Sequence, residues 1–260
     1  MPRWRPRLRR LWNRVLPGVP LPLRIAPGFW WIARRDVISD ALFSGTFETS
    51  GRAFLTSFLE PGMTVLDVGA HGGVYTMLAA RLVSPGGRVV SFEPSDRERT
   101  RLLDHLRLNG ITNVTVVPSA VGAEDGEVEL LVVGGQETGC NSLRKPPGER
   151  ARGVRVPITT LDACIERHGI GRVDFIKMDI EGGERDALRG AERLFSRDRP
   201  ALLCEIEPAR IAPWGYDPHE ILSMLDRRQY DWFSLDPDGL PVALRDRPAT
   251  LSGEYVALPR

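Results

Sequence analysis

Acidic residues follow three apolar segments of the chain that have the composition of buried strands. Asp67 ends the first segment, Asp179 and Glu181 follow the second, and Glu205 lies near the end of the third. Ligands of parallel α/β sheets bind at the carboxyl ends of the strands. If these strands are neighbours, the acids meet at one site, where a carboxylate could take the proton from a hydroxyl group held for reaction.

Lys177 lies in the second of these segments and is one of only two lysines in the chain. Because side chains alternate across a strand, Lys177 and Asp179 are expected on the same face. The lysine could hold the carboxylates in place, or act as a base if burial lowers its pKa. The alternative interpretation is a structural ion-pair network at a helix start. Grouped acids could also bind Mg²⁺, but no ligand spacing demands it, so no metal site is predicted.

A glycine-rich turn follows Asp67 and precedes residues 74–82, which have helical character. Gly69 and Gly73 allow the backbone to approach a ligand closely, and the amides at the helix start point at it. A strand, a glycine turn and a helix in this order form the first unit of a nucleotide-binding sheet. His71 also lies in the turn, either packed near the ligand or, as a minor option, acting as a base.

Asp67 and His71 distinguish between two nucleotide-like ligands. His71 replaces the second glycine of the dinucleotide fingerprint, and the charge of Asp67 would repel a pyrophosphate. The same charge suits S-adenosylmethionine, which carries a sulfonium and an ammonium group. Glu93 follows the next apolar segment at a position where a carboxylate binds the ribose hydroxyls of either ligand. The residues favour S-adenosylmethionine. An NAD-dependent oxidoreductase and a non-enzymatic binding module are the alternatives.

Two further loops are expected near this ligand. Residues 114–117 form the third predicted strand, and Ser119 and Ala120 after it are expected at the adenine edge. Residues 134–153 form a long polar loop between two strands. Such a loop is typical of a lid over a substrate or of a disordered hairpin tip, and both interpretations stay open.

Strands alternate with helices through most of the chain, which predicts an α/β fold with a mostly parallel sheet covered on both faces. His105 lies in one of the helices and is expected at the surface or with its hydrogen bonds satisfied. Strands are predicted at 29–33, 63–67, 88–92, 114–117, 127–133, 154–158, 173–178, 201–206, 231–235 and 254–258. Helices are predicted at 36–43, 48–60, 95–108, 161–168, 184–195 and 219–230.

The composition allows one large α/β domain and argues against several other classes of protein. With 260 residues and a net charge of +1, the chain gives no overall electrostatic case for binding nucleic acid. Its three cysteines, Cys140, Cys164 and Cys204, show no zinc or disulfide spacing. No apolar run has the length of a membrane span or the flanks of a signal peptide. These observations predict a cytoplasmic protein.

Residues 1–35 are predicted as an arginine- and proline-rich extension of a domain that covers residues 36–260. Over residues 1–16, arginines alternate with tryptophan and aliphatic residues, which suits a membrane surface or an acidic partner protein. Pro2 and Pro6 disrupt an early helix and favour a solvated tail. Residues 17–28 contain four prolines and are interpreted as a linker or extended arm.

These features together resemble the FkbM-type methyltransferase family over roughly residues 36–207. The resemblance implies a class I methyltransferase (Rossmann-like) fold with a seven-stranded sheet, S-adenosylmethionine as donor and usually a hydroxyl acceptor. His71 and Gly72 depart from the commoner Asn-Ile pair of the family. The similar stretches are VLDVGAHGGVYT (65–76), VVSFEP (89–94), LDA (161–163) and IKMDIEGGERDALRGA (176–191).

We therefore expect an S-adenosylmethionine-dependent O-methyltransferase that acts on a hydroxyl group of a small molecule or sugar. Asp179, Glu181 and Lys177 are the candidate catalytic residues. The predicted cofactor-binding residues are Asp67, Gly69, His71, Gly73, Glu93, Ser119 and Ala120, and the resemblance assigns Asp67, Gly69, Gly73 and Glu93 to the family's cofactor motif.

Overall fold

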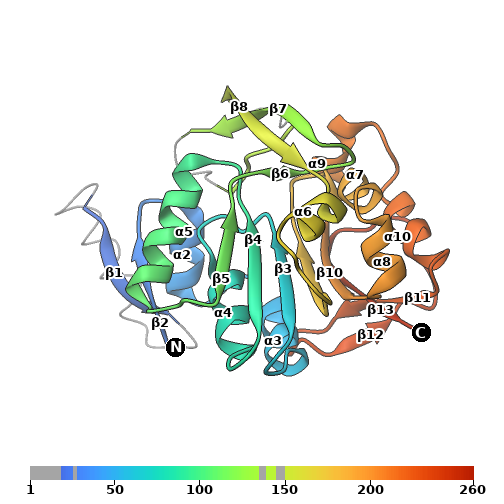
Figure 1. Ribbon diagram of the computed structural model, residues 1–260, viewed down its shortest axis with the longest axis horizontal. Helices are drawn as coiled ribbons and strands as arrows, with labels where there is room; N and C mark the ends of the chain where they lie inside the picture. The colour runs from blue at the N-terminus through green and yellow to red at the C-terminus, as the bar shows by residue number, and fades with distance from the viewer. Residues whose placement is uncertain (1–18, 26–27, 135–138, 145–149) are drawn as a thin grey trace.

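A large mixed sheet forms the centre of the chain, whose computed structural model describes residues 19–25, 28–134, 139–144 and 150–260 (Figure 1). Five consecutive strands that reach one edge are parallel, and the three strands at the other edge alternate in direction. In spatial order the strands are β12 (Pro241–Ala243), β11 (Tyr230–Leu235), β13 (Gly253–Pro259), β10 (Ala201–Ile206), β9 (Phe175–Met178), β3 (Thr64–Val68), β4 (Arg88–Phe92) and β5 (Val114–Val117).

The structure confirms the predicted fold class, but the predicted strand count of seven differs from the eight strands found among the described residues. The additional strand is β12, which pairs with β11 in a hairpin at the edge of the sheet. All three residues of β12 are exposed. The strand therefore lacks the alternation of buried and exposed side chains on which strand prediction depends.

Helices cover both faces of this sheet (Figure 1). Because side chains alternate along a strand, Val65 joins one buried cluster and Leu66 joins the other. On the face of Val65 lie α3 (Thr49–Phe58), α4 (Val74–Leu82) and α5 (Asp96–Leu108). On the face of Leu66 lie α6 (Leu161–Arg167), α7 (Glu184–Arg189), α8 (Glu192–Arg197) and α10 (His219–Asp226). Short helical segments are α2 (Val37–Ser44), α9 (Pro208–Ile211) and η1 (Ala212–Trp214).

The strand order reverses at β3. The chain runs outward from β3 to β4 and β5, and it later returns to β9 on the other side of β3. The loops after β3 and β9 therefore diverge, which leaves a crevice at the carboxyl ends of these strands. This is the position at which the predicted site residues are expected to meet.

The helix predicted around residues 184–195 is two helices, α7 and α8. Gly190 lies between them, so close to a neighbouring loop that an added Cβ would lie 2.1 Å from a carbonyl oxygen. Asp162 accepts hydrogen bonds from the backbone amides of Arg193 at 2.9 Å and Leu194 at 2.8 Å. Asp162 thus caps the first turn of α8, so a new helix begins there. The spacing of apolar residues does not record this contact.

A second, three-stranded sheet lies over the strand ends. It consists of β6 (Ala120–Val121), β8 (Ala151–Thr159) and β7 (Gly126–Val133), and β7 and β8 form the predicted hairpin. Of the loop predicted at 134–153, residues 135–138 and 145–149 lie outside the described residues. Residues 139–144 are described, and Ser142 pairs with Leu131 of β7.

The predicted linker or arm at 17–28 contains β1 (Leu21–Ile25), which pairs antiparallel with β2 (Phe29–Ala33). Ile25, Phe29, Trp31 and Ala33 are buried in the same cluster as α4. The hairpin thus shares a hydrophobic core with the domain predicted to begin at residue 36. Residues 1–16, predicted as an amphipathic or solvated tail, lie outside the described residues.

His105 links this hairpin to the glycine turn. Its ring stacks on Trp31 with centroids 3.9 Å apart. Nε2 accepts from the backbone amide of Ile32 at 3.0 Å, and Nδ1 lies 2.7 Å from the carbonyl oxygen of Gly72. A carbonyl only accepts, so Nδ1 carries the proton. Burial lowers the pKa of this histidine, which is buried with both ring nitrogens satisfied.

Within the described residues, no helix combines the length and the apolar character that crossing a membrane requires.

Replacing Trp31 with alanine tests whether the hairpin is part of the core. Trp31 is 3% exposed, so Trp31→Ala should lower the free energy of unfolding by about 3–5 kcal/mol. The neighbouring Trp30 is 45% exposed, and Trp30→Ala should change it by only about 0.5 kcal/mol. Urea unfolding measures both variants. Equal effects would contradict the packing described.

Candidate active site

A cavity opens where β3, β9 and β10 end, and all ten predicted site residues line it. The structure therefore brings together residues that are up to 114 positions apart, from Asp67 to Glu181. Lining the cavity from the predicted cofactor set are Asp67, Gly69, His71, Gly73, Glu93, Ser119 and Ala120. From the predicted catalytic set, Lys177, Asp179 and Glu181 line it.

The glycines of the turn are required for its close packing against the loop after β9 and against α5. Gly69 has φ +88°, and an added Cβ would lie 1.9 Å from the carbonyl oxygen of Asp179. Gly73 has φ +90°, and its added Cβ would lie 2.3 Å from a side-chain carbon of Leu102. The space that a Cβ would occupy at each glycine is thus taken by neighbouring protein atoms and not by a ligand.

Glu93 fixes the glycine turn and the start of α5. Its Oε2 accepts from the backbone amide of His71 and its Oε1 from the amide of Ser95, each at 2.8 Å. Burial raises the pKa of Glu93 to about 8. Each carboxylate oxygen keeps a further lone pair, so the group can also accept from a ligand in the cavity.

Asp67 has an unsatisfied oxygen at the cavity. The residue is 1% exposed, and its Oδ2 accepts from Thr76 Oγ1 at 2.5 Å. Its Oδ1 has no hydrogen-bond partner among the described residues. Burial raises the pKa of Asp67 despite the opposing charge of Lys177. A buried acceptor without a partner is rare in folded proteins, and a donor or cation of a bound ligand would satisfy it.

The register of the sheet places a lysine among the acids. Asp67 pairs with Lys177 across the β3–β9 ladder, and Glu205 continues the same face of β10 two residues after Leu203, the partner of Lys177. Lys177 Nζ lies 2.9 Å from Asp179 Oδ2. The predicted common face of Lys177 and Asp179 is therefore confirmed.

Asp179 and Glu205 form a hydrogen-bonded carboxyl pair with unequal acidity. Burial raises the pKa of Asp179, but the charge of Lys177 and the hydrogen bond from Glu205 outweigh it, so the pKa lies below its usual value. The charge of Asp179, with burial, raises the pKa of Glu205 to about 10. At neutral pH, Glu205 holds the proton and donates it to an ionised Asp179.

The idea that Lys177 acts as a base is contradicted by its surroundings. Burial lowers the pKa of Lys177, but the charges of Asp179, Asp67 and Glu48 outweigh this effect and raise it above its usual value. The ammonium group stays protonated. Its other predicted role, holding the carboxylates in position, agrees with the geometry.

Glu181 differs from Asp179 in its partner. Its Oε2 lies 2.9 Å from Arg210 Nε, and its backbone oxygen accepts from Ser142 Oγ and Trp214 Nε1, each at 3.1 Å. The Glu181 carboxylate is thus paired with an arginine, as in the structural ion-pair network that was the alternative interpretation. Asp179 is paired with a lysine on the cavity wall and is the better placed of the two to receive a proton.

Glu48 and Tyr75 line the cavity, and Glu254 bonds to Tyr75, but none of the three was predicted from the sequence. Tyr75 Oη donates to Glu254 Oε1 at 2.8 Å, and Glu254 Oε2 accepts from the backbone amide of Gly51 at 3.1 Å. Glu48 lines the cavity with φ +36°, and burial raises its pKa to about 7. Glu48, Tyr75 and Glu254 come from distant segments, so no spacing in the sequence could have grouped them.

The mostly parallel sheet, with helices on both faces, has the class I methyltransferase fold. The methyltransferase FkbM domain matches residues 67–231, which is more than half of the chain. The chain therefore belongs to the FkbM methyltransferase family, which confirms the resemblance inferred from the glycine turn and the residues after β9.

Two known proteins illustrate the extent of the similarity. The AMB antimetabolite synthetase AmbE of Pseudomonas aeruginosa is 28% identical over 167 residues, which cover 52% of this chain and 8% of AmbE. The crystal structure of a methyltransferase FkbM from Methylobacillus flagellatus KT has a TM-score of 0.51 at 20% identity, covering 85% of this chain and 52% of that one. The chain thus spans a small part of AmbE and about half of the FkbM structure, whose likeness shows the fold alone.

The buried carboxyl groups predict that stability falls as pH rises. Glu48, Glu93 and Glu205 have an ordinary pKa of 4.5 and folded values of about 7, 8 and 10. The folded chain binds protons that the unfolded chain releases, so their contribution is complete below pH 4.5 and is lost as pH rises through the folded values. The Tm should fall between pH 5.5 and 9, by about 2–4 °C for each kcal/mol lost.

Calorimetric scans at constant ionic strength measure how Tm changes with pH. Glu205→Gln should flatten the alkaline part of this dependence, because Gln cannot release the proton that Glu205 holds. A Tm that stays constant or rises over this range would contradict the assigned protonation states.

Proposed function

We propose that this methyltransferase transfers a methyl group from S-adenosylmethionine to a hydroxyl oxygen of a small molecule or sugar. The observation that carries the proposal is a single cavity with two chemically distinct ends. Glu93, Ser119 and Ala120 follow β4 and β5 and line one end, and Lys177 and Asp179 lie at the end of β9, on the other side of β3, and line the other. When bound, S-adenosylmethionine supplies an electrophilic methyl group on a positively charged sulfur.

The polar groups of the cavity suit this cofactor. Asp67 Oδ1, buried and without a partner among the described residues, would accept from the ammonium group. Glu93 would accept from the ribose hydroxyls through the lone pairs that the amides of His71 and Ser95 leave open. Ser119 and Ala120, which precede and begin β6, would contact the adenine. A dinucleotide is disfavoured because its pyrophosphate would meet Asp67 and the His71 side chain.

Asp179 is the proposed acceptor of the hydroxyl proton. Lys177 and Glu205 both bond to its carboxylate and so fix its orientation toward the cavity. An oxygen that gains a methyl group becomes positively charged and strongly acidic, so a carboxylate with a low pKa is a sufficient base. Asp179 also holds the hydroxyl in line for the transfer, which contributes through orientation.

The acceptor end of the cavity supports an uncharged hydroxyl compound. Glu48, Asp179 and Glu205 supply acceptors for hydroxyl groups, and Ile38 and Phe47 supply apolar surface. Such a mixture is typical of small-molecule sites. At neutral pH the charge of Lys177 is balanced by Asp179 while Glu205 holds its proton, so this end has no excess positive charge to bind an anionic acceptor.

Replacing Asp179 with asparagine should abolish most of the turnover and leave the affinity for S-adenosylmethionine almost unchanged. Asn keeps the shape but accepts a proton poorly, so kcat should fall by about 100-fold or more. Glu181→Gln is the matched control, and its effect on kcat should be much smaller because Arg210 occupies that carboxylate. Acceptors are found first by screening hydroxyl compounds for the mass gain of one methyl group. Near-normal turnover by Asp179→Asn would remove Asp179 from this role.

The affinity for S-adenosylmethionine should increase with pH. Ribose hydroxyls donate to the ionised form of Glu93, whose pKa of about 8 leaves the group protonated at neutral pH. The Kd measured by calorimetry should fall by up to about tenfold between pH 7 and 9, since one pKa unit corresponds to a factor of ten.

Glu93→Gln should bind more weakly and lose this pH dependence. NAD, titrated in the same way, should not bind. Binding of NAD alone, or an unchanged pH dependence in Glu93→Gln, would contradict the proposed cofactor contacts.

A further inference from the structure

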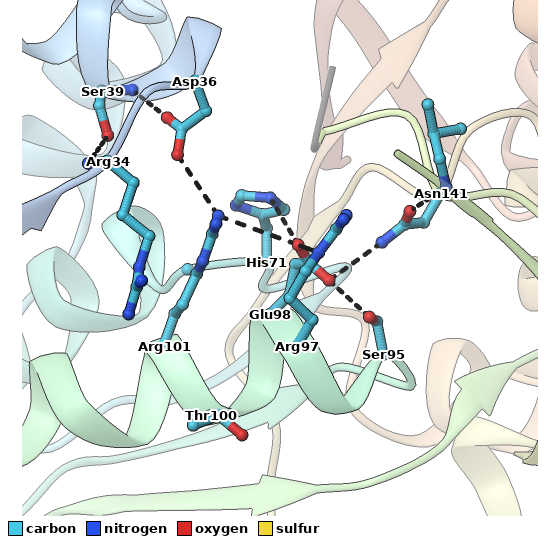
Figure 2. Close-up of polar contacts among 12 residues, drawn as sticks. Arg34, Asp36, Ser39, His71, Ser95, Arg97, Glu98, Thr100, Arg101 and Asn141 are labelled. Carbon is cyan, nitrogen blue, oxygen red and sulfur yellow. Dashed lines mark hydrogen bonds and ion pairs between the residues drawn. The ribbon is translucent and has the colours of Figure 1, made fainter. Parts of the chain in front are cut away.

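Glu98 on α5 is a completely buried carboxylate outside the predicted site. Its Oε2 accepts from Ser95 Oγ at 2.5 Å and from Asn141 Nδ2 at 3.3 Å. Its Oε1 accepts from Arg97 Nε at 2.6 Å and lies 3.9 Å from His71 Nε2 (Figure 2). Glu98 therefore contacts the helix start, the glycine turn and the loop 139–144 at the same time.

This arrangement departs from the expected role of an acid at the third helical position. In a capping box, the side chain of Glu98 would accept from the backbone amide of Ser95. Here that amide donates to Glu93, and the hydroxyl of Ser95 donates to Glu98. Ser95 makes no side-chain capping bond. Glu98 is thus available to hold Asn141, which comes from a different part of the fold.

We call residues 139–144 the strap, because they run along the cavity between its two ends. Gly139, Cys140, Asn141, Ser142 and Leu143 all line the cavity. Figure 2 shows the side chain of Asn141 directed at Glu98 from the side opposite to His71 and Arg101. The Asn141 Oδ1 atom also accepts from the backbone amide of Val133 at 3.0 Å, so both polar atoms of this side chain are used.

The strap is also attached at the acceptor end of the cavity. Ser142 Oγ donates to the backbone oxygen of Glu181 at 3.1 Å, and Cys140 Sγ lies 3.0 Å from Arg210 Nη2. Arg210 in turn pairs with Glu181. The strap therefore connects the loop after β9 with α5. Its contact with α5 is the hydrogen bond from Asn141 to Glu98, at the end of the cavity that Glu93 lines.

We infer that Glu98 is a positioning residue, which holds the strap against the cofactor end of the cavity through Asn141. The inference rests on the proposed function, because it assigns the strap to the adenosine part of S-adenosylmethionine. Arginines surround Glu98 as well: Arg101 Nη1 lies 3.9 Å from its Oε1 and 3.4 Å from Asp36 Oδ2. A hydrogen bond to a carboxylate that also pairs with guanidinium groups is stronger than one between neutral groups, which favours the contact with Asn141.

Exchanging donor and acceptor tests this connection. Asn141→Asp has almost the same shape but places a second carboxylate against Glu98, so the strap should be released. Glu98→Gln combined with Asn141→Asp restores a donor opposite an acceptor and keeps the total charge of the wild type. Arg107→Gln, on a side chain of α5 that is 73% exposed, is the control for a change of one charge unit.

The first measurement is hydrogen exchange of the strap amides by mass spectrometry, without any ligand. Asn141→Asp should lower their protection by about tenfold, and the double variant should restore at least half of this loss on a logarithmic scale. The Arg107→Gln control should match the wild type. Unchanged strap protection in Asn141→Asp, or no recovery in the double variant, would overturn the inference.

The second measurement is calorimetric titration with S-adenosylmethionine. Asn141→Asp should raise the Kd by about tenfold with little change in Tm, and the double variant should recover most of it. A Kd equal to that of the wild type, or a loss explained by a lower Tm, would overturn the positioning role. If the wild type itself does not bind S-adenosylmethionine, the proposed function fails, while the exchange data still decide whether Glu98 holds the strap.

Discussion

The buried ammonium group of Lys177 is the interaction on which the site depends. It lies between Asp67 and Asp179 at the ends of two adjacent strands, with Tyr75 below it. Burying a charge is unfavourable unless partners compensate the lost hydration, and here each sign supplies the compensation for the other. Removing the lysine would leave several carboxyl groups crowded in a cavity of low polarity. They would then take up protons, and Asp179 would lose the ionised state that its proposed role requires.

Close contacts behind the glycine turn keep this cluster in position. The missing side chain of Gly69 lets the loop after β3 lie against the backbone of Asp179. His105 supports the same turn from the other side by donating to the carbonyl oxygen of Gly72. Trp31 stacks on His105, so the β1–β2 hairpin stabilises the turn although it contributes no side chain to the predicted site. Packing at the periphery thus constrains the geometry of the cavity.

The acidic residues in and around the cavity come from inside and outside the segment that matches the family. Residues 67–231, which match the FkbM domain, contain Asp67, Glu93 and Asp179. Glu48 and Glu254 lie outside this match and surround Tyr75 from opposite ends of the chain. Glu205 and Glu254 are directly opposite in the antiparallel ladder, where two like charges are unfavourable. The charge of Asp179, with burial, raises the pKa of Glu205, burial raises the pKa of Glu254, and the pKa of Asp179 lies below its usual value.

The sequence by itself determined the features that depend on local spacing. Period-two and helical patterns gave the central parallel strands and the helices between them, and strand ends placed Asp67, Glu93 and Asp179 at one edge. Only the tertiary structure decided the protonation of these acids, because pKa values depend on burial and on neighbours from other segments. The grouping of Glu48, Tyr75 and Glu254, the break between α7 and α8, and the Asn141–Glu98 contact also join residues far apart in the chain, and no local pattern records such contacts.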